Sequence, residues 1–317
     1  MNRENIKKIG VIGTGMIGTS IAVLTTGHGF DTVMFAMDEA LRDASRKAYD
    51  NFYSDIEAHK LLTDKQISIC SSHLSYSFDY DAFKDCDIIF ECVVEKVDIK
   101  HQVYQEIVKH CPKVRAICSV SSAIVVEDLV AKMTTYKDRV IVAHPFYPPH
   151  LVPYFELASG TDTDLSVITF VKTVLEDLDR KPVVLKKSAP GFIGNRLQFA
   201  LWREALNIVD SGIANPEDVD TCLRYSFCPR YTAIGMYEHF DNAGLQLNYN
   251  VSKTIFPTLS NIKEVPASIS DKIERGDLGR PTGKGFYDWT KIDKKDFDER
   301  VGSPYWRLFN WDVSNIQ

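Results

Sequence analysis

One histidine stands where it could take a proton from a substrate. His144 follows the apolar run Val140–Ala143 and precedes a proline-rich run at 145–149. The apolar run predicts a buried strand, and ligands of open α/β sheets bind beyond the carboxyl ends of strands. A neutral imidazole at such a place can accept the proton of an alcohol while hydride leaves the adjacent carbon. Position alone leaves a buried or turn histidine as the alternative.

A carboxylate follows 12 residues further along the chain. Glu156 lies in the mainly apolar segment 152–157, and an unpaired buried charge is costly, so this side chain needs a partner. Pairing with His144 would orient the imidazole and favour its protonated form. The alternative is an ordinary surface acid on an edge strand.

Two further polar residues are candidates for the same site. Ser121, in the serine-rich segment 119–122 after a predicted strand, offers a hydroxyl to a substrate oxygen or to a nicotinamide. Serines at such turns are also common helix caps. Asn195 lies one turn inside a predicted helix, after Pro190-Gly191, and could point its amide into a cleft between domains. Contact with solvent or with an interface is the alternative for Asn195.

A glycine-rich loop near the start of the chain has the spacing of dinucleotide-binding turns. Gly13-Thr14-Gly15-Met16-Ile17-Gly18 follows an apolar strand and opens a helix, whose N-terminus can bind a pyrophosphate. An acid normally ends the second strand and binds the ribose, but here Ala36 occupies that place. Asp38 is either a ribose ligand or a helix N-cap. We expect NAD as the cofactor and leave NADP open, because Arg42 could meet a 2′-phosphate.

Apolar runs and helical patterns alternate through the first half of the chain. This alternation predicts an α/β fold with a Rossmann-type, doubly wound parallel sheet. The pattern becomes mainly helical after residue 191, which predicts a smaller, all-helical C-terminal domain. We therefore expect a nucleotide-binding domain at 1–189 and a helical domain at 190–317. The predicted strands are 8–12, 32–36, 87–92, 115–120, 140–144, 155–158 and 182–186, and the predicted helices are 17–26, 40–60, 99–110, 126–133, 165–178, 192–211, 216–225 and a long amphipathic region at 235–258.

Composition excludes several classes of protein. The 317 residues are 44% hydrophobic and 25% charged, with a formal net charge of −6 and no basic block. Such a chain lacks the basic stripe of a nucleic-acid partner and the long apolar segment of a membrane span. Its seven cysteines are odd in number and form no Cys-x-x-Cys pair. We expect a reduced, cytoplasmic chain without a metal site.

Together these residues resemble the L-3-hydroxyacyl-CoA dehydrogenase family, from about Lys8 to Trp289. The resemblance implies His144 as the base, Glu156 as its partner, Ser121 as a ligand of the substrate hydroxyl and Asn195 as a fourth active-site residue. It also implies that Glu95 and Lys100 contact the cofactor, and that the helical domain forms a homodimer. The segments that carry the resemblance are 12–18, 91–95, 119–122, His144 with Glu156, 190–196 and 283–287.

Some departures from the family pattern bear on the substrate. The thioester branch usually reads His-Phe-Phe-Asn-Pro, whereas His-Pro-Phe-Tyr-Pro-Pro at 144–149 is more similar to the L-gulonate 3-dehydrogenase and lambda-crystallin branch. The thioester branch often carries lysines for the CoA phosphate after the second strand, but segment 51–57 is aromatic and acidic. We expect a dehydrogenase of a free 3-hydroxy acid such as L-gulonate. A 3-hydroxybutyryl-CoA dehydrogenase is one alternative, and a crystallin-like, NAD(H)-binding structural protein is another.

Two apolar segments have no predicted role in catalysis. The residues 199–202 and 208–209 would suit a dimer interface or an internal core equally well. The aromatic tail 305–311 is expected to dock against the body of the protein or a neighbouring subunit, with a frayed end as the alternative.

Overall fold

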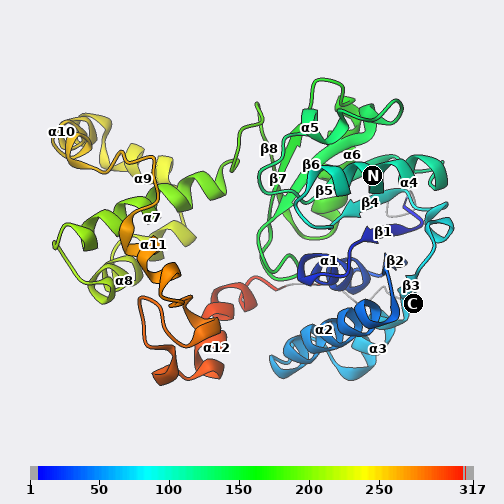
Figure 1. Ribbon diagram of the computed structural model, residues 1–317, viewed down its shortest axis with the longest axis horizontal. Coiled ribbons are helices and arrows are strands. Elements are labelled where there is room, and N and C mark those ends of the chain that lie inside the picture. The colour runs from blue at the N-terminus through cyan, green and yellow to red at the C-terminus, as the bar shows by residue number, and fades with distance from the viewer. Residues whose placement is uncertain (1–5, 310, 312–317) are drawn as a thin grey trace. The chain divides into compact units, whose positions relative to one another are not determined.

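The computed structural model describes residues 6–309 and 311. Its contacts divide the chain into two units, which we call the nucleotide unit (Met1–Phe192 with Glu299–Gln317) and the helical unit (Ile193–Asp298). Figure 1 shows the sheet of the first unit and the helices of the second. The first boundary lies three residues after the expected one, and the C-terminal segment groups with the nucleotide unit.

An eight-stranded sheet forms the centre of the nucleotide unit, in the order β3-β2-β1-β4-β5-β6-β7-β8. Neighbouring strands are parallel, except that β6 and β7 are antiparallel. The carboxyl ends of β1, β4, β5 and β6 therefore meet at one edge, which is where ligands bind in this fold. The strands are β1 (Ile9–Ile12), β2 (Thr32–Phe35), β3 (Leu74–Ser77), β4 (Ile88–Glu91), β5 (Ala116–Ser119), β6 (Val140–Pro145), β7 (Tyr154–Ser159) and β8 (Lys181–Val184).

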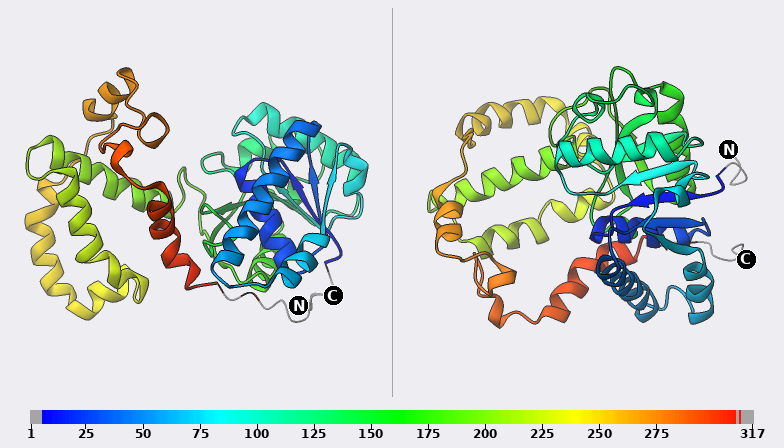
Figure 2. Two further views of the ribbon diagram at one scale, coloured as in Figure 1. Left: turned by 90° about the horizontal axis from the view of Figure 1, so that it is seen from below. Right: turned by 45° about the vertical axis from the view of Figure 1, so that its right-hand side comes forward.

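Helices cover both faces of this sheet (Figure 2), as expected for strands that are apolar on both sides. One hydrophobic core packs the sheet against α1, α2, α3 and α6, and the other packs it against α4 and α5. The fold class predicted from the sequence is confirmed. These helices are α1 (Met16–Gly27), α2 (Glu39–Ala58), α3 (Asp64–Ser72), α4 (Val97–His110), α5 (Val126–Val130) and α6 (Leu165–Asp177).

The helical unit begins with α7 (Gly194–Asp210) and α8 (Pro216–Tyr225). The long helical region expected at 235–258 is instead divided, because Gly244 has a φ of +93° that a helix cannot continue through. It forms α9 (Met236–Ala243), α10 (Leu245–Ile255) and a short 3₁₀ turn. The sequence did not predict β3, α3, α11 (Ala267–Glu274) or α12 (Lys294–Trp306). Among the described residues, no helix has the length and apolarity needed to cross a bilayer.

The aromatic tail docks on the nucleotide unit, which confirms one of the two expectations for it. Trp306 stacks on His59 with ring centroids 4.0 Å apart. Trp311 is buried, lies 5.1 Å from the ring of His28 and occupies the space beside Gly27 that a Cβ would need. These contacts explain why the C-terminal segment groups with the first unit. Asn310 lies outside the described residues.

Truncation of the buried tryptophan tests this contact. Trp311→Ala removes a large aromatic side chain from a packed site, and we expect the free energy of unfolding to fall by about 3 kcal/mol, the lower end for such changes. Leu308→Ala is the matched control, because Leu308 is exposed on the same segment and its loss should cost less than about 0.5 kcal/mol. Denaturant unfolding measures both, and equal effects would contradict the docking of the tail.

Candidate active site

The antiparallel pairing of β6 with β7 places His144 directly opposite Glu156. The Nδ1 atom of His144 lies 2.9 Å from Oε2 of Glu156, and both side chains are buried. A carboxylate accepts but does not donate, so Nδ1 carries the proton of this hydrogen bond. The neutral ring then has Nε2 free to accept a proton. The structure therefore brings together the two residues that the sequence nominated as a base and its partner.

Aromatic side chains surround the imidazole of His144. The ring of Phe146 lies 5.6 Å away and that of Phe192 lies 5.5 Å away, centroid to centroid. Phe192 is buried and has a φ of +47°, an unfavourable conformation for a residue with a Cβ. Such strain persists only where the surroundings hold it in place, and it clusters at functional sites. The apolar surroundings keep water from the ring face of His144.

A second buried acid, Glu91, ends strand β4, two strands from β6 in the sheet, and was given no role from the sequence. Its carboxylate accepts hydrogen bonds from Nζ of Lys100 at 2.8 and 3.0 Å, from the Tyr104 hydroxyl at 3.0 Å and from the Ser119 hydroxyl at 2.8 Å. Both Glu91 and Lys100 are completely buried. Lys100 is thus the counterion of a buried acid here, and its contact with the cofactor stays a prediction.

Glu95 and Ser121 meet beside this cluster. The Ser121 hydroxyl donates to Oε1 of Glu95 and accepts from the backbone N–H of Ile124 at 2.8 Å. Burial disfavours the ionised form of Glu95, but the bond from Ser121 and the nearby Lys100 outweigh it and lower the pKa of this carboxyl. Because its oxygen accepts from the backbone N–H groups of Ala123 and Ile124, Ser121 also caps this turn. Its contact with a substrate hydroxyl, and that of Glu95 with the cofactor, stay predictions.

The glycine loop fits a pyrophosphate. A Cβ on Gly18 would lie 2.1 Å from the carbonyl oxygen of Gly13, and one on Gly13, whose φ is +117°, would lie 2.6 Å from that of Cys92. A Cβ on Gly15 would meet nothing within 4 Å, so the backbone is open on that side. No side chain caps the N-terminus of α1, where Met16 and Ile17 begin the helix. Its free N–H groups are the ones that bind phosphate in dinucleotide folds.

The end of β2 has alanine where an acid usually binds the ribose. Ala36 is buried, and the next acid, Asp38, accepts a hydrogen bond from the backbone N–H of Leu41 at 2.8 Å. Asp38 is therefore the N-cap of α2, one of the two roles expected for it. A contact between Asp38 and the ribose stays a prediction.

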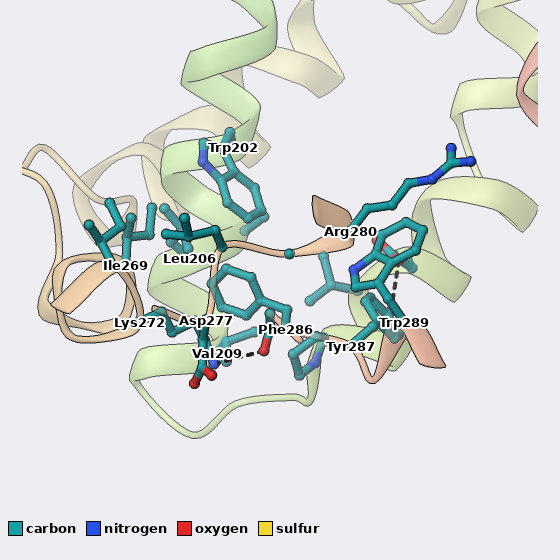
Figure 3. Close-up of a pocket in the computed structure, with 18 of the residues that line it drawn as sticks. Trp202, Leu206, Val209, Ile269, Lys272, Asp277, Arg280, Phe286, Tyr287 and Trp289 are labelled. Atoms are coloured by element: carbon teal, nitrogen blue, oxygen red, sulfur yellow. Dashed lines mark hydrogen bonds between the residues drawn. The ribbon is translucent and has the colours of Figure 1, made fainter. Parts of the chain in front are cut away.

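Asn195 and a separate pocket belong to the helical unit. Asn195 is the second residue of α7, and its approach to His144 stays a prediction. The pocket encloses about 920 Å³ and is lined by the aromatic rings of Trp202, Phe286 and Trp289 among other residues (Figure 3). None of the predicted catalytic residues lines it.

Comparison with known proteins agrees with this arrangement. Residues 8–188 match the family described as "3-hydroxyacyl-CoA dehydrogenase, NAD binding domain", and residues 191–289 match its C-terminal domain. The chain belongs to this family. It is accordingly an NAD-dependent dehydrogenase that acts on CH–OH groups.

Its relatives act on different substrates. A 5-formyl-3-hydroxy-2-methylpyridine 4-carboxylate 5-dehydrogenase of Mesorhizobium japonicum is 28% identical over 92% of this chain and 93% of its own length. An L-carnitine dehydrogenase of Oceanobacillus iheyensis is 33% identical over 75% of this chain and 76% of its own. A 3-hydroxybutyryl-CoA dehydrogenase of Bradyrhizobium diazoefficiens is 28% identical over 90% of this chain and 96% of its own length. The crystal structure of a dehydrogenase with the first activity, described as an NAD⁺-dependent dismutase, superposes with a TM-score of 0.85 at 26% identity, over 96% of this chain and 97% of that one.

Filling the tight turn tests the nucleotide loop. Gly18→Ala forces a methyl group against the Gly13 carbonyl, so we expect NADH affinity to fall by at least tenfold. Gly235→Ala is the matched control, since Gly235 precedes a helix in the other unit with an ordinary φ of −73°, and its Cβ would make an ordinary contact of 3.4 Å with Glu238. NADH fluorescence titration measures both. An unchanged affinity in Gly18→Ala would show that this loop does not bind the cofactor.

Proposed function

We propose that this protein oxidises the secondary hydroxyl of a free L-3-hydroxy acid and, in reverse, reduces the corresponding 3-oxo acid. The observation that carries the proposal is the buried pair of His144 and Glu156, joined at 2.9 Å at the carboxyl edge of the sheet. A purely structural, crystallin-like protein has no need of such a pair.

The geometry assigns a task to each member of the pair. Nε2 of His144 takes the proton of the substrate hydroxyl, and Nδ1 keeps its own proton in the bond to Glu156. The carboxylate of Glu156 fixes the tautomer and stabilises the imidazolium that forms. The glycine loop would hold NAD, which would supply the hydride acceptor. The apolar rings of Phe146 and Phe192 limit competing proton exchange with water.

The exposed face of α2 supports a free acid over a CoA thioester. The aromatic residues expected there point inward, since Phe52 and Tyr53 are buried in the core. Asp55 and Glu57 remain on the surface, and a hydrogen bond with Asp64 raises the pKa of Glu57. Adjacent acids repel a CoA phosphate instead of binding it.

Substitution of the base and a substrate panel test this function together. We expect L-gulonate or L-carnitine to be turned over with NAD in preference to 3-hydroxybutyryl-CoA, as read from NADH absorbance. His144→Ala should lower kcat by about 10²–10⁴-fold, the usual contribution of a positioned general base, with NADH affinity nearly unchanged. His110→Ala, at a partly exposed histidine of α4, is the control and should leave kcat unchanged.

Three outcomes would overturn the proposal in part or whole. Faster turnover of 3-hydroxybutyryl-CoA than of the free acids would show that the substrate is an acyl-CoA. Binding of NADH without turnover of any 3-hydroxy acid would indicate the structural role. Full activity of His144→Ala would exclude the proposed base.

We further propose a homodimer formed through the helical unit. Several large apolar side chains of α7 are exposed, among them Leu197, Phe199 and Trp202, the last two of which line the pocket of Figure 3. Exposed apolar patches of this kind mark interaction surfaces, and a twofold interface uses the same patch on both chains.

A charge placed in this patch should separate the subunits. We expect the unaltered protein to sediment with twice the mass of one chain and Phe199→Asp to sediment as a monomer at the same concentration. Leu165→Asp is the control, because Leu165 is 74% exposed on the nucleotide unit, and it should remain dimeric. A monomeric unaltered protein, or a dimeric Phe199→Asp, would contradict this interface.

A further inference from the structure

A tyrosine holds the oxygen of Glu156 that His144 does not use. Tyr154 lies two residues before Glu156 on β7, so the two side chains extend from the same face of the sheet. The Tyr154 hydroxyl donates to Oε1 at 3.1 Å, while Oε2 accepts from Nδ1 of His144 at 2.9 Å. Each oxygen of the carboxylate thus has its own donor, and the plane of the carboxylate is fixed from both sides.

The ring of Tyr154 also makes a packing contact. It packs edge-on against Phe146, with centroids 5.6 Å apart and planes at 66°, and Phe146 in turn contacts the ring of His144. Burial raises the pKa of Tyr154, and the adjacent charge of Glu156 raises it further. The phenol therefore keeps its proton at every pH at which the enzyme would work and remains a donor throughout.

A donor on a carboxylate changes what the carboxylate does to its other partner. The bond from Tyr154 stabilises the negative charge on Glu156 and makes it a weaker proton acceptor. The pull of that charge on a proton at Nε2 of His144 is reduced in the same measure. Without the phenol, the carboxylate would favour the imidazolium more strongly and would be freer to rotate.

We propose that Tyr154 is a positioning residue of the active site, which orients the Glu156 carboxylate toward His144 and moderates its charge. This inference rests on the proposed role of the His144–Glu156 pair. Neither the sequence patterns nor the family resemblance had assigned a task to this tyrosine.

Other titratable groups near the pair do not substitute for this effect. His150, in the β6–β7 connection, is buried beside Arg180, and burial lowers its pKa to about 3, so it stays neutral. Tyr147 of the same connection also stays neutral, because burial raises its pKa. In the described part of β8 and the segment just after it, Lys181, Lys186 and Lys187 are exposed, so solvent screens their charges.

The test is the titration of the His144 ring itself. The protein is labelled with ¹³C-histidine, and the signal of His144 is identified as the one missing in His144→Gln. We expect Tyr154→Phe to raise the midpoint of the His144 titration by roughly half a pH unit or more. The acid limb of kcat/KM for alcohol oxidation should move in the same direction. Phenylalanine keeps the ring contacts, so NADH affinity should change little.

Two controls separate this effect from a general loss of a tyrosine hydroxyl. Tyr287→Phe removes a comparable phenol–carboxylate bond, of 2.8 Å to Asp220 in the helical unit, and should leave the midpoint unchanged. In a Glu156→Gln background, Tyr154→Phe should shift the midpoint by less than about 0.2 pH unit, because the charge through which Tyr154 acts is gone.

An unchanged or lowered midpoint in Tyr154→Phe would overturn the inference, as would an equal shift in the Glu156→Gln background. The titration needs no substrate, so it remains informative if the substrate panel fails. An inactive protein with the expected shift would refute the proposed function and leave the link between Tyr154 and Glu156 standing.

Discussion

The site depends on the register of the antiparallel pair β6–β7. This register sets the Cα of His144 opposite that of Glu156, so the two side chains leave the sheet on the same face. A shift of one residue would send one of them to the other face and leave a buried carboxylate unpaired, at a cost of several kcal/mol. The bond between His144 and Glu156 and the stability of the strand pair therefore require the same register.

Two buried acids lie in this sheet, Glu91 at the end of β4 and Glu156 within β7, and they have different partners. Glu91 accepts hydrogen bonds from the ammonium of Lys100 and from two hydroxyl groups. Glu156 has a titratable partner and a phenol. Glu156 thus contacts an imidazole, a group suited to proton transfer, whereas Glu91 contacts an ammonium and hydroxyls.

Local pattern was sufficient to predict most of the elements, but for His144 and Glu156 it left alternatives open, and the family resemblance decided between them. The ends of the strands can be recognised in the sequence because the apolar runs stop there. The predicted and observed ends differ by no more than two residues. The strand Leu74–Ser77 was not visible, since its alternating leucine, serine and tyrosine are only partly buried at an edge. The family resemblance implied that Lys100 contacts the cofactor, and a lysine on a helix gives no sign in the sequence that its ammonium is buried. The burial of this ammonium depends on Glu91, which lies on another element. The bond from Tyr154 to Glu156 likewise depends on a side-chain orientation that residue spacing does not encode.

The nucleotide loop and the catalytic strand are joined by one further contact, which explains how two distant segments keep their alignment. Ser20 of α1, two residues after the glycine loop, bonds Nδ1 of His150 at 2.7 Å and accepts from the backbone N–H of His150 at 3.1 Å. Arg180 donates to the carbonyl oxygens of Pro149 and His150, so the connection between β6 and β7 is held from both sides. Because the pKa of His150 is about 3, this contact does not titrate in the range where a catalytic histidine works. The link between the glycine loop and the strand that carries His144 is thus made by groups that do not change charge near neutral pH.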